Sequence, residues 1–356
     1  MRRILILLLL LVIIVSCQSR AIVDSPQLDQ LELGLSFPPI ANENQRSFTT
    51  KQLDALDVQM IRFAVDWRNR EPEKGEYYWE PFDERMVWVE ENDLSVVLTV
   101  QSIGPEWACD PEMTNEISCV YTDLEAFEEF VHALLVRYPG QIEKIQFGNE
   151  WISGFWFVGD IDAFITANNI LYDVTKKVSP ETEVVLGGFA TGTLHALAFC
   201  EGALDYIYLG DGTYSSDRSL CEMDEVQRGY DRLYGVAENA KFDLVDLHFY
   251  DNAEDWLVEY EVIQAYFTDD MKYIVTEFGG PHLGQEDYSD QYQAERLGLY
   301  IETLDAMGIE EAYYYKLVEG GSANQYHMKS GLFTNLYLFK RKKPSFAVFQ
   351  AYSILE

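Results

Sequence analysis

Residues 144–151 read KIQFGNEW, and this stretch predicts the fold and the site together. Ile145 and Phe147 place apolar side chains on one parity, which is typical of a β-strand. The strand pattern ends at Gly148, and Asn149 and Glu150 follow at once. We interpret an amide and a carboxylate at the C-terminal end of a strand, with the indole of the next residue beside them, as a functional site rather than as packing.

Residues 273–280 read YIVTEFGG and repeat this arrangement, because an apolar strand again ends in a glutamate, Glu277. Taken singly, either glutamate is more often a solvated loop charge. Together they predict a carboxylate pair, provided that the fold brings the ends of the two strands to one place.

Strand patterns alternate with helical patterns along most of the chain. Strands are expected at 31–36, 58–65, 94–101, 143–150, 183–188, 243–250, 272–278 and 311–317, and helices include 123–137 (opened by Thr122), 160–178, 291–307 and 344–354. Such alternation predicts an α/β fold, a single (β/α)8 TIM barrel, with an extended loop insertion at 191–234 after the fifth strand. A doubly wound sheet is the alternative, but no glycine-rich phosphate-binding turn follows an early strand.

The N-terminus resembles a lipoprotein-type signal peptide. Residues 4–15 are all apolar, too short a run for the ~20 residues that span a bilayer. Residues 14–17, IVSC, resemble the bacterial lipobox, which implies cleavage before Cys17 and acylation of its thiol. We expect a signal peptide at 1–17, a linker at 18–30 and the barrel at 31–356, in an exported protein anchored to the membrane only by lipid. An ordinary secretion signal or an anchor helix is the alternative.

The remaining cysteines agree with export. Their short separations favour the disulfides Cys109–Cys119 and Cys200–Cys221, although four thiols allow three pairings. Four buried free thiols are the alternative.

The formal net charge of −34 predicts a surface that repels nucleic acid and anionic polysaccharide, so a neutral carbohydrate fits best. Adaptation to a saline habitat would give the same charge. A basic pocket around Arg62 or Lys316 could override this field locally.

Functional groups of TIM barrels stand at the C-terminal ends of the strands. The chain presents there Arg62, Trp67, Gln101, Trp107, Asn149, Glu150, Trp151, His248, Tyr250, Glu277, Tyr315 and Lys316. Aromatic rings can stack on sugar C–H faces, while amides and carboxylates bind hydroxyls, so this set predicts a carbohydrate site. No metal and no cofactor are expected, because the sequence has no His-Glu-x-x-His motif and no phosphate loop. The absence of a Gly-x-Ser-x-Gly elbow argues against a serine hydrolase.

In this order the residues resemble clan A glycoside hydrolases, the retaining (β/α)8 group, and in particular families 5, 39 and 42. Asn149-Glu150 matches the Asn-Glu pair of strand four, residues 274–279 match the nucleophile strand, and residues 248–250 match the His-x-Tyr of strand six. Arg62 matches the strand-two arginine of family 5. The likeness covers residues 31–353.

The resemblance implies that Glu277 is the nucleophile and Glu150 the acid/base, that Arg62 and Tyr250 hydrogen-bond Glu277, and that Asn149 holds the sugar 2-hydroxyl. Gln101 stands where family 5 has a histidine, and residues 313–316 (YYYK) stand where it has a tryptophan. These departures leave the family and the substrate open.

Other interpretations remain for single residues and for the whole chain. His248 could be a core histidine, and the four tryptophans Trp67, Trp107, Trp151 and Trp156 could be core aromatics, with at least one expected as a sugar platform. Strand parity predicts that Tyr315 faces the barrel mouth and Lys316 the helix layer. A catalytically inactive carbohydrate-binding surface lipoprotein on the same barrel is the alternative function.

Overall fold

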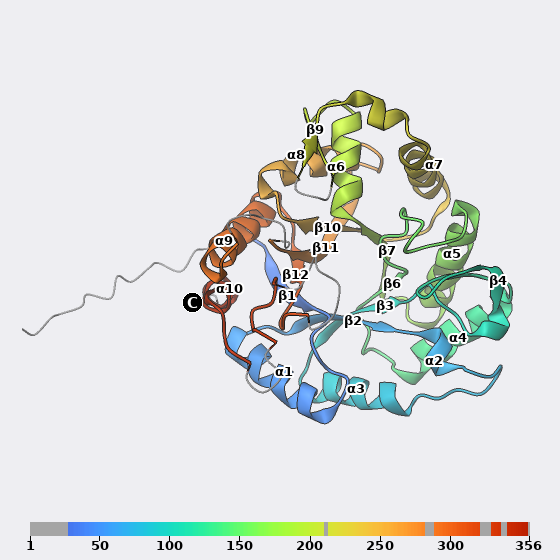
Figure 1. Ribbon diagram of the computed structural model, residues 1–356. Helices are drawn as coiled ribbons and strands as arrows, with labels where there is room; N and C mark the ends of the chain where they lie inside the picture. Colours follow the sequence, from blue (N-terminus) through green and yellow to red (C-terminus); the bar gives the residue numbers. More distant parts are fainter. Residues whose placement is uncertain (1–27, 210–212, 282–287, 321–328, 336–339, 355–356) are drawn as a thin grey trace, which may run out of the picture.

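The computed structural model describes residues 28–209, 213–281, 288–320, 329–335 and 340–354 (Figure 1). Eight parallel strands form a closed barrel in the order β1-β12-β11-β10-β7-β6-β3-β2, which confirms the predicted (β/α)8 architecture. The predicted signal peptide, Cys17 and most of the predicted linker lie outside the described residues. None of the described helices is both long and apolar enough to cross a membrane.

The barrel strands lie where the sequence predicts them, and at least one α-helix follows each (Figure 1). The strands are β1 (Glu32–Ser36), β2 (Met60–Val65), β3 (Ser95–Val100), β6 (Lys144–Phe147), β7 (Glu183–Phe189), β10 (Leu244–Tyr250), β11 (Lys272–Gly279) and β12 (Glu311–Tyr314). The helices are α1 (Glu43–Leu56), α2 (Trp67–Arg70), α3 (Glu80–Glu91), α4 (Leu124–Arg137), α5 (Ile161–Val178), α6 (Thr191–Cys200), α7 (Asp224–Asn239), α8 (Ala253–Gln264), α9 (Asp290–Ala306) and α10 (Pro344–Ser353).

Helix α4 begins one residue later than the sequence suggested. The side chain of Asp123, not Thr122, accepts a hydrogen bond from the backbone N–H of Ala126 and caps the helix. Asp160 caps α5 in the same way, through the N–H of Ala163. A carboxylate suits this position because it also complements the positive end of the helix dipole.

The barrel interior has an apolar layer and a polar layer. The apolar layer is a buried cluster separate from the main core, made of Met60, Val97, Val185, Leu244, Ile274 and Tyr313. Two residues further along their strands, and so on the same face, lie Arg62, Thr99 and Asp246, all buried. The apolar layer therefore closes the barrel beneath a polar layer that opens toward the C-terminal ends of the strands.

A β-bulge in β11 sets the direction of Glu277. Along β10, Asp246 and His248 are two residues apart, but their partners in β11, Ile274 and Glu277, are three apart. The pairing of β11 with β12 shifts over the same stretch. The extra residue brings Glu277 onto the inward face that Ile274 occupies, which strict alternation would not do.

Two disulfides join segments that are close in the sequence. The hairpin of β4 (Cys109–Thr114) and β5 (Cys119–Tyr121) is closed by Cys109–Cys119. Cys200–Cys221 joins the end of α6 to the 3-10 helix η2 (Arg218–Glu222). Both predicted pairings are confirmed. Two disulfides indicate an oxidising compartment, such as the cell exterior or the periplasm.

The insertion after the fifth barrel strand is largely structured. It contains α6, the small hairpin of β8 (Ile207–Tyr208) and β9 (Tyr214–Ser215), η2 and the first turns of α7. The apolar composition of α6, with Leu194, Leu197 and Phe199 buried, explains its packing against the barrel.

Candidate active site

Glu277 is the most strongly held side chain of the site. Its Oε1 lies 2.5 Å from a guanidinium nitrogen of Arg62, and the hydroxyl of Tyr250 donates to its Oε2 at 2.6 Å. The second terminal nitrogen of Arg62 donates to Oδ1 of Asn149 at 2.7 Å. The structure thus brings together four of the residues that the sequence nominated, from strands β2, β10 and β11 and from the loop after β6.

The environment of Glu277 favours the ionised carboxylate. Burial alone would raise its pKa, but the positive charges of His248 and Arg62 and the hydrogen bond from Tyr250 outweigh burial. The pKa of Glu277 is therefore lowered to about 2. A buried carboxylate that stays anionic at neutral pH has the electronic character of a nucleophile.

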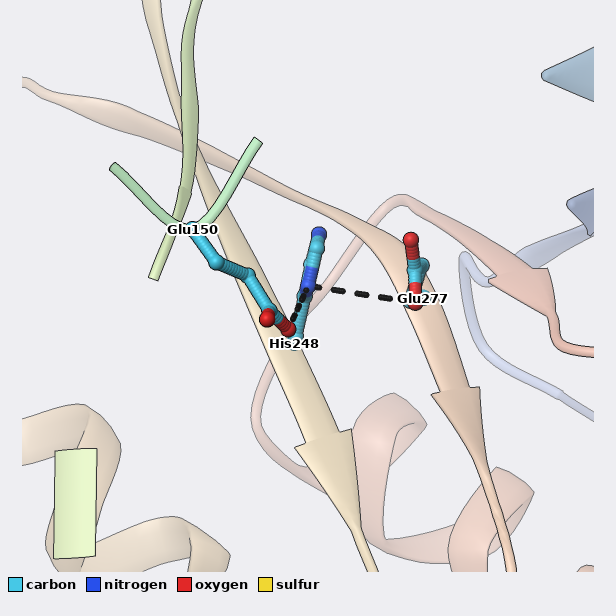
Figure 2. A group of neighbouring side chains, drawn as sticks. All are labelled: Glu150, His248 and Glu277. Atoms are coloured by element: carbon cyan, nitrogen blue, oxygen red, sulfur yellow. Dashed lines mark hydrogen bonds and ion pairs between the residues drawn. The ribbon is translucent and has the colours of Figure 1, made fainter. Parts of the chain in front are cut away.

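His248 lies between the two carboxylates (Figure 2). Its Nδ1 is 2.9 Å from Oε1 of Glu150 and 3.9 Å from Oε2 of Glu277. Burial would lower the pKa of this imidazole, but the charges of Glu277 and Asp246 and its hydrogen bonds raise it to about 10. His248 is therefore a buried imidazolium that faces carboxylates on both edges of its ring.

A chain of hydrogen bonds through the barrel interior connects Arg62 with His248. Nε of Arg62 donates to Oε1 of Gln146 at 3.0 Å, and Nε2 of Gln146 donates to Oδ2 of Asp246 at 3.1 Å. The same oxygen of Asp246 lies 3.3 Å from Nε2 of His248 and accepts a bond from the hydroxyl of Thr276 at 2.5 Å. The residues that orient the two glutamates thus belong to one network.

Sequence reasoning missed Gln146 and Asp246. A signal was present for both, because each lies an even number of residues before a nominated side chain or turn, Asp246 before His248 and Gln146 before Gly148. Even spacing on a strand predicts the same face. Neither residue stands at the end of a predicted strand, where the functional groups of TIM barrels are expected.

The two carboxylates meet at a cavity of about 420 Å³ at the barrel mouth. Its walls include Phe37, Arg68, Gln101, Glu116, Ile117, Asn149, Glu150, Trp156, Glu277 and Tyr315. Glu150 is partly exposed and has a left-handed backbone with φ of 44°, two residues after Gly148 with φ of 70°. The chain turns sharply there, so that Glu150 points back toward Glu277.

Glu150, His248 and Glu277 are also a set that could hold a metal ion. One potential ligand atom from each lies within 4.8 Å of the others, and no other such set occurs in the described ranges. Oε1 of Glu277 is already paired with the guanidinium of Arg62, so a cation would have to compete with that ion pair and displace the proton of His248.

The nominated tryptophans separate into core and cavity residues. Trp67 is fully buried among Trp107, Tyr121, Phe127 and Phe130, and Trp151 is buried against Phe164 and Phe189 with its indole N–H on the carbonyl of Gly187. Neither lines the cavity, so direct sugar contact is excluded for both. Trp156 lines the cavity instead. Phe37, which the sequence did not single out, also lines it, and the guanidinium of Arg62 lies 4.9 Å from the centre of the Phe37 ring.

Tyr315 lines the cavity, but the parity argument for Lys316 does not apply. Strand β12 ends at Tyr314, so alternation does not extend to Lys316. The ammonium of Lys316 lies 4.9 Å from the centre of the Tyr315 ring. Burial lowers the pKa of Lys316, while the nearby charges of Glu277 and Glu319 oppose this shift. Lys316 therefore lies on the side of the site rather than against helix-borne glutamates.

Comparison with known proteins gives matches in structure but not in sequence. No family model and no curated protein matches the sequence. A GH5_18 structure from Bifidobacterium longum in complex with Manβ1-4GlcNAc is similar over 91% of this chain and 78% of its own, with TM-score 0.65 and 14% identity. A structure of a β-glucosidase named 1317 is similar over 86% of this chain and 87% of its own, with TM-score 0.64 and 16% identity.

A family 39 glycoside hydrolase from Bacteroides cellulosilyticus WH2 has TM-score 0.61 and 15% identity; the match covers 91% of this chain and 63% of that one. The barrel has the same fold as these glycoside hydrolases. The resemblance to clan A, inferred from the motifs, is confirmed at this level, and the similar structures come from several families, so no single family is assigned.

Proposed function

We propose that the protein is a retaining glycoside hydrolase that cleaves a β-glycosidic bond in a neutral oligo- or polysaccharide. The observation that carries this proposal is the placement of Glu150 and Glu277, which offer oxygens within 4.8 Å of one another at the cavity. Retaining enzymes hold their carboxyl groups ~5–5.5 Å apart, whereas inverting enzymes need ~6.5–9.5 Å to admit a water molecule.

In the first step, Glu277 attacks the anomeric carbon and forms a glycosyl–enzyme ester. Glu150 donates a proton to the oxygen of the departing sugar as the glycosidic bond breaks. In the second step, Glu150 accepts a proton from water, and that water attacks the anomeric carbon and releases Glu277. Asn149 would bind the 2-hydroxyl from its position at the cavity wall, where Arg62 fixes its amide.

The competing function, a carbohydrate-binding protein on an inactive barrel, does not require the charges of the site. Such a protein needs aromatic platforms, but it does not need a buried Glu277 kept anionic by Arg62, Tyr250 and His248. Even when paired, buried charges carry a desolvation cost that can exceed their mutual attraction, and sugar binding alone gives no reason to carry that cost. We therefore favour the enzyme.

Variants of the two glutamates test the proposal. Glu277→Gln should abolish turnover of aryl β-glycosides, and Glu150→Ala should keep slow hydrolysis of substrates with activated leaving groups and gain rate with azide, giving a β-glycosyl azide. Early products followed by proton NMR should keep the β configuration. Glu112→Gln, an exposed carboxylate of the β4–β5 hairpin, is the control. Full activity in either active-site variant, or an inverted first product, would refute the mechanism.

We further propose that the enzyme is exported as a lipoprotein acylated on Cys17. The two disulfides support an oxidising location, and the IVSC stretch at 14–17 supplies the acceptor thiol. Labelling with a palmitate analogue should mark the wild type and leave a Cys17→Ser variant unlabelled.

A further inference from the structure

A second pocket opens beside the catalytic cavity. It has a volume of about 410 Å³ and lies between the segment after β1, the end of β2 with α2, and helix α3. Phe37, Ala64 and Gln101 line both spaces, so the pocket and the cavity share a wall. A group attached to a sugar in the cavity could therefore enter the pocket.

Arg85 of α3 lines this pocket without a partner. Its Nε is buried and makes no hydrogen bond, and in the part of the chain that the structure describes its guanidinium forms no ion pair. The protein has 60 acidic and 26 basic residues, so a carboxylate partner would be easy to supply. A buried nitrogen of a charged group without a hydrogen-bond partner is unfavourable, so the Nε–H of Arg85 is available to donate to a ligand in the pocket.

Arg70 lines the same pocket, and it too has spare hydrogen-bonding capacity. Its one hydrogen bond among the described residues goes to the carbonyl of Tyr78 at 3.1 Å. The nearest carboxylates already have partners: Asp83 is held by Arg137 through two bonds of 2.7 Å, and Asp66 accepts bonds from Asn69.

The positive charges of this corner reinforce one another. Burial lowers the pKa of Arg85, and the charges of Arg70 and of Arg46 on α1 lower it further. Helices α1 and α3 lie side by side here (Figure 1). Asp66 also lies on the pocket wall, and its charge and that of Asp83 act on Arg70, but the two arginines outnumber the one carboxylate of the pocket lining. The pocket is locally basic in an acidic protein.

We propose that this pocket binds an oxyanion, a carboxylate or a sulfate ester, carried by one sugar of an otherwise neutral chain. This inference rests on the proposed glycosidase function and narrows its substrate. Guanidinium groups bind planar oxyanions through paired, charge-assisted hydrogen bonds. The net charge repels a dense polyanion at long range, whereas salt screens that field beyond ~8–10 Å and leaves contacts inside the pocket intact.

Binding of small anions tests the proposal without requiring catalysis. The probes are sodium sulfate and sodium D-glucuronate, with sodium chloride of equal ionic strength and D-glucose as references, titrated into the Glu277→Gln protein and followed by calorimetry. We expect saturable binding of at least one probe, weakened at least tenfold by Arg85→Gln or Arg70→Gln. Arg341→Gln, which removes an exposed arginine paired with Asp290, should bind as the parent does.

The arms separate the possible outcomes. Sulfate binding alone points to a sulfate ester, and glucuronate binding points to a uronic acid. The proposal is overturned if neither probe binds, or if the Arg85→Gln and Arg70→Gln variants bind the probes as tightly as the parent Glu277→Gln protein. If Arg85→Gln does not fold, Arg70→Gln and Arg85→Lys decide, the latter keeping the charge but losing the planar fork. Turnover of a neutral aryl glycoside by the wild-type protein shows separately whether the proposed function holds.

Discussion

Nδ1 of His248 lies 2.9 Å from a carboxylate oxygen of Glu150 and 3.9 Å from one of Glu277, so one buried imidazole contacts both glutamates of the site. The other ring nitrogen faces Asp246, which Gln146 connects to Arg62. A change at any of these residues is therefore expected to reach both glutamates.

Stability should decline as pH rises above neutrality because of His248. Its pKa is 6.5 as the ordinary value and about 10 in the folded protein. A raised folded-state pKa contributes stability that is fully present below pH 6.5 and is lost as pH rises toward 10. We expect the unfolding free energy of the wild type to fall across this interval by an amount on the order of a few kcal/mol. The melting temperature should fall with it. His248→Gln should flatten that slope; an unchanged slope would show that His248 is neutral when folded.

Removing the positive charge of Arg62 should move the acid limb of the pH–rate profile upward. Arg62 is one of the groups that lower the pKa of Glu277, so Arg62→Met should raise that pKa and protonate the nucleophile at a higher pH. We also expect kcat to fall by ~10²–10³, since a preorganised charge contact is lost. Arg62→Lys should give a smaller shift in the same direction. Profiles of kcat/KM that coincide for wild type and Arg62→Met would contradict this role.

Gly188 should be intolerant of a side chain because His248 occupies the space above it. A Cβ at this position would lie 2.2 Å from Nε2 of His248, so the imidazole would have to move from Asp246 and Glu150. Gly188→Ala should lower kcat by about tenfold or more and reduce thermal stability. Gly192→Ala is the control, since a Cβ there meets nothing within 4 Å. Equal activity of the two variants would show that His248 can shift without consequence.

Tyr315 should contribute through its ring more than through its hydroxyl. The ring lines the cavity and lies edge-on to Phe37, with centroids 6.3 Å apart. Burial raises the pKa of the phenol to about 12, so it stays neutral in the working range. Tyr315→Ala should lower kcat/KM by ~10–100-fold and Tyr315→Phe by only a few-fold. If Lys316→Ala is the more damaging change, the ammonium near Glu277 is the more important group.

The sequence alone determined the barrel and the pair of glutamates. Parallel strands covered by helices must be apolar along their length, so the eight runs and the helices between them were readable from local pattern. Glu150 and Glu277 stood out because each breaks an apolar run at its C-terminal end. The disulfides were readable for a similar reason, since short sequence separation limits the partners of a cysteine.

Only the tertiary structure decided which face each side chain occupies. The bulge in β11 turns Glu277 inward against strict alternation, and sequence gives no period for an inserted residue. Trp67 and Trp151 follow strand ends, yet both pack into the core. Trp156, five residues after Trp151 in the loop that follows β6, lines the cavity. The partners of Arg62 and His248, and the lack of a partner for Nε of Arg85 among the described residues, depend on contacts between residues far apart in the chain. Such contacts are fixed when the barrel closes, and no local pattern specifies them.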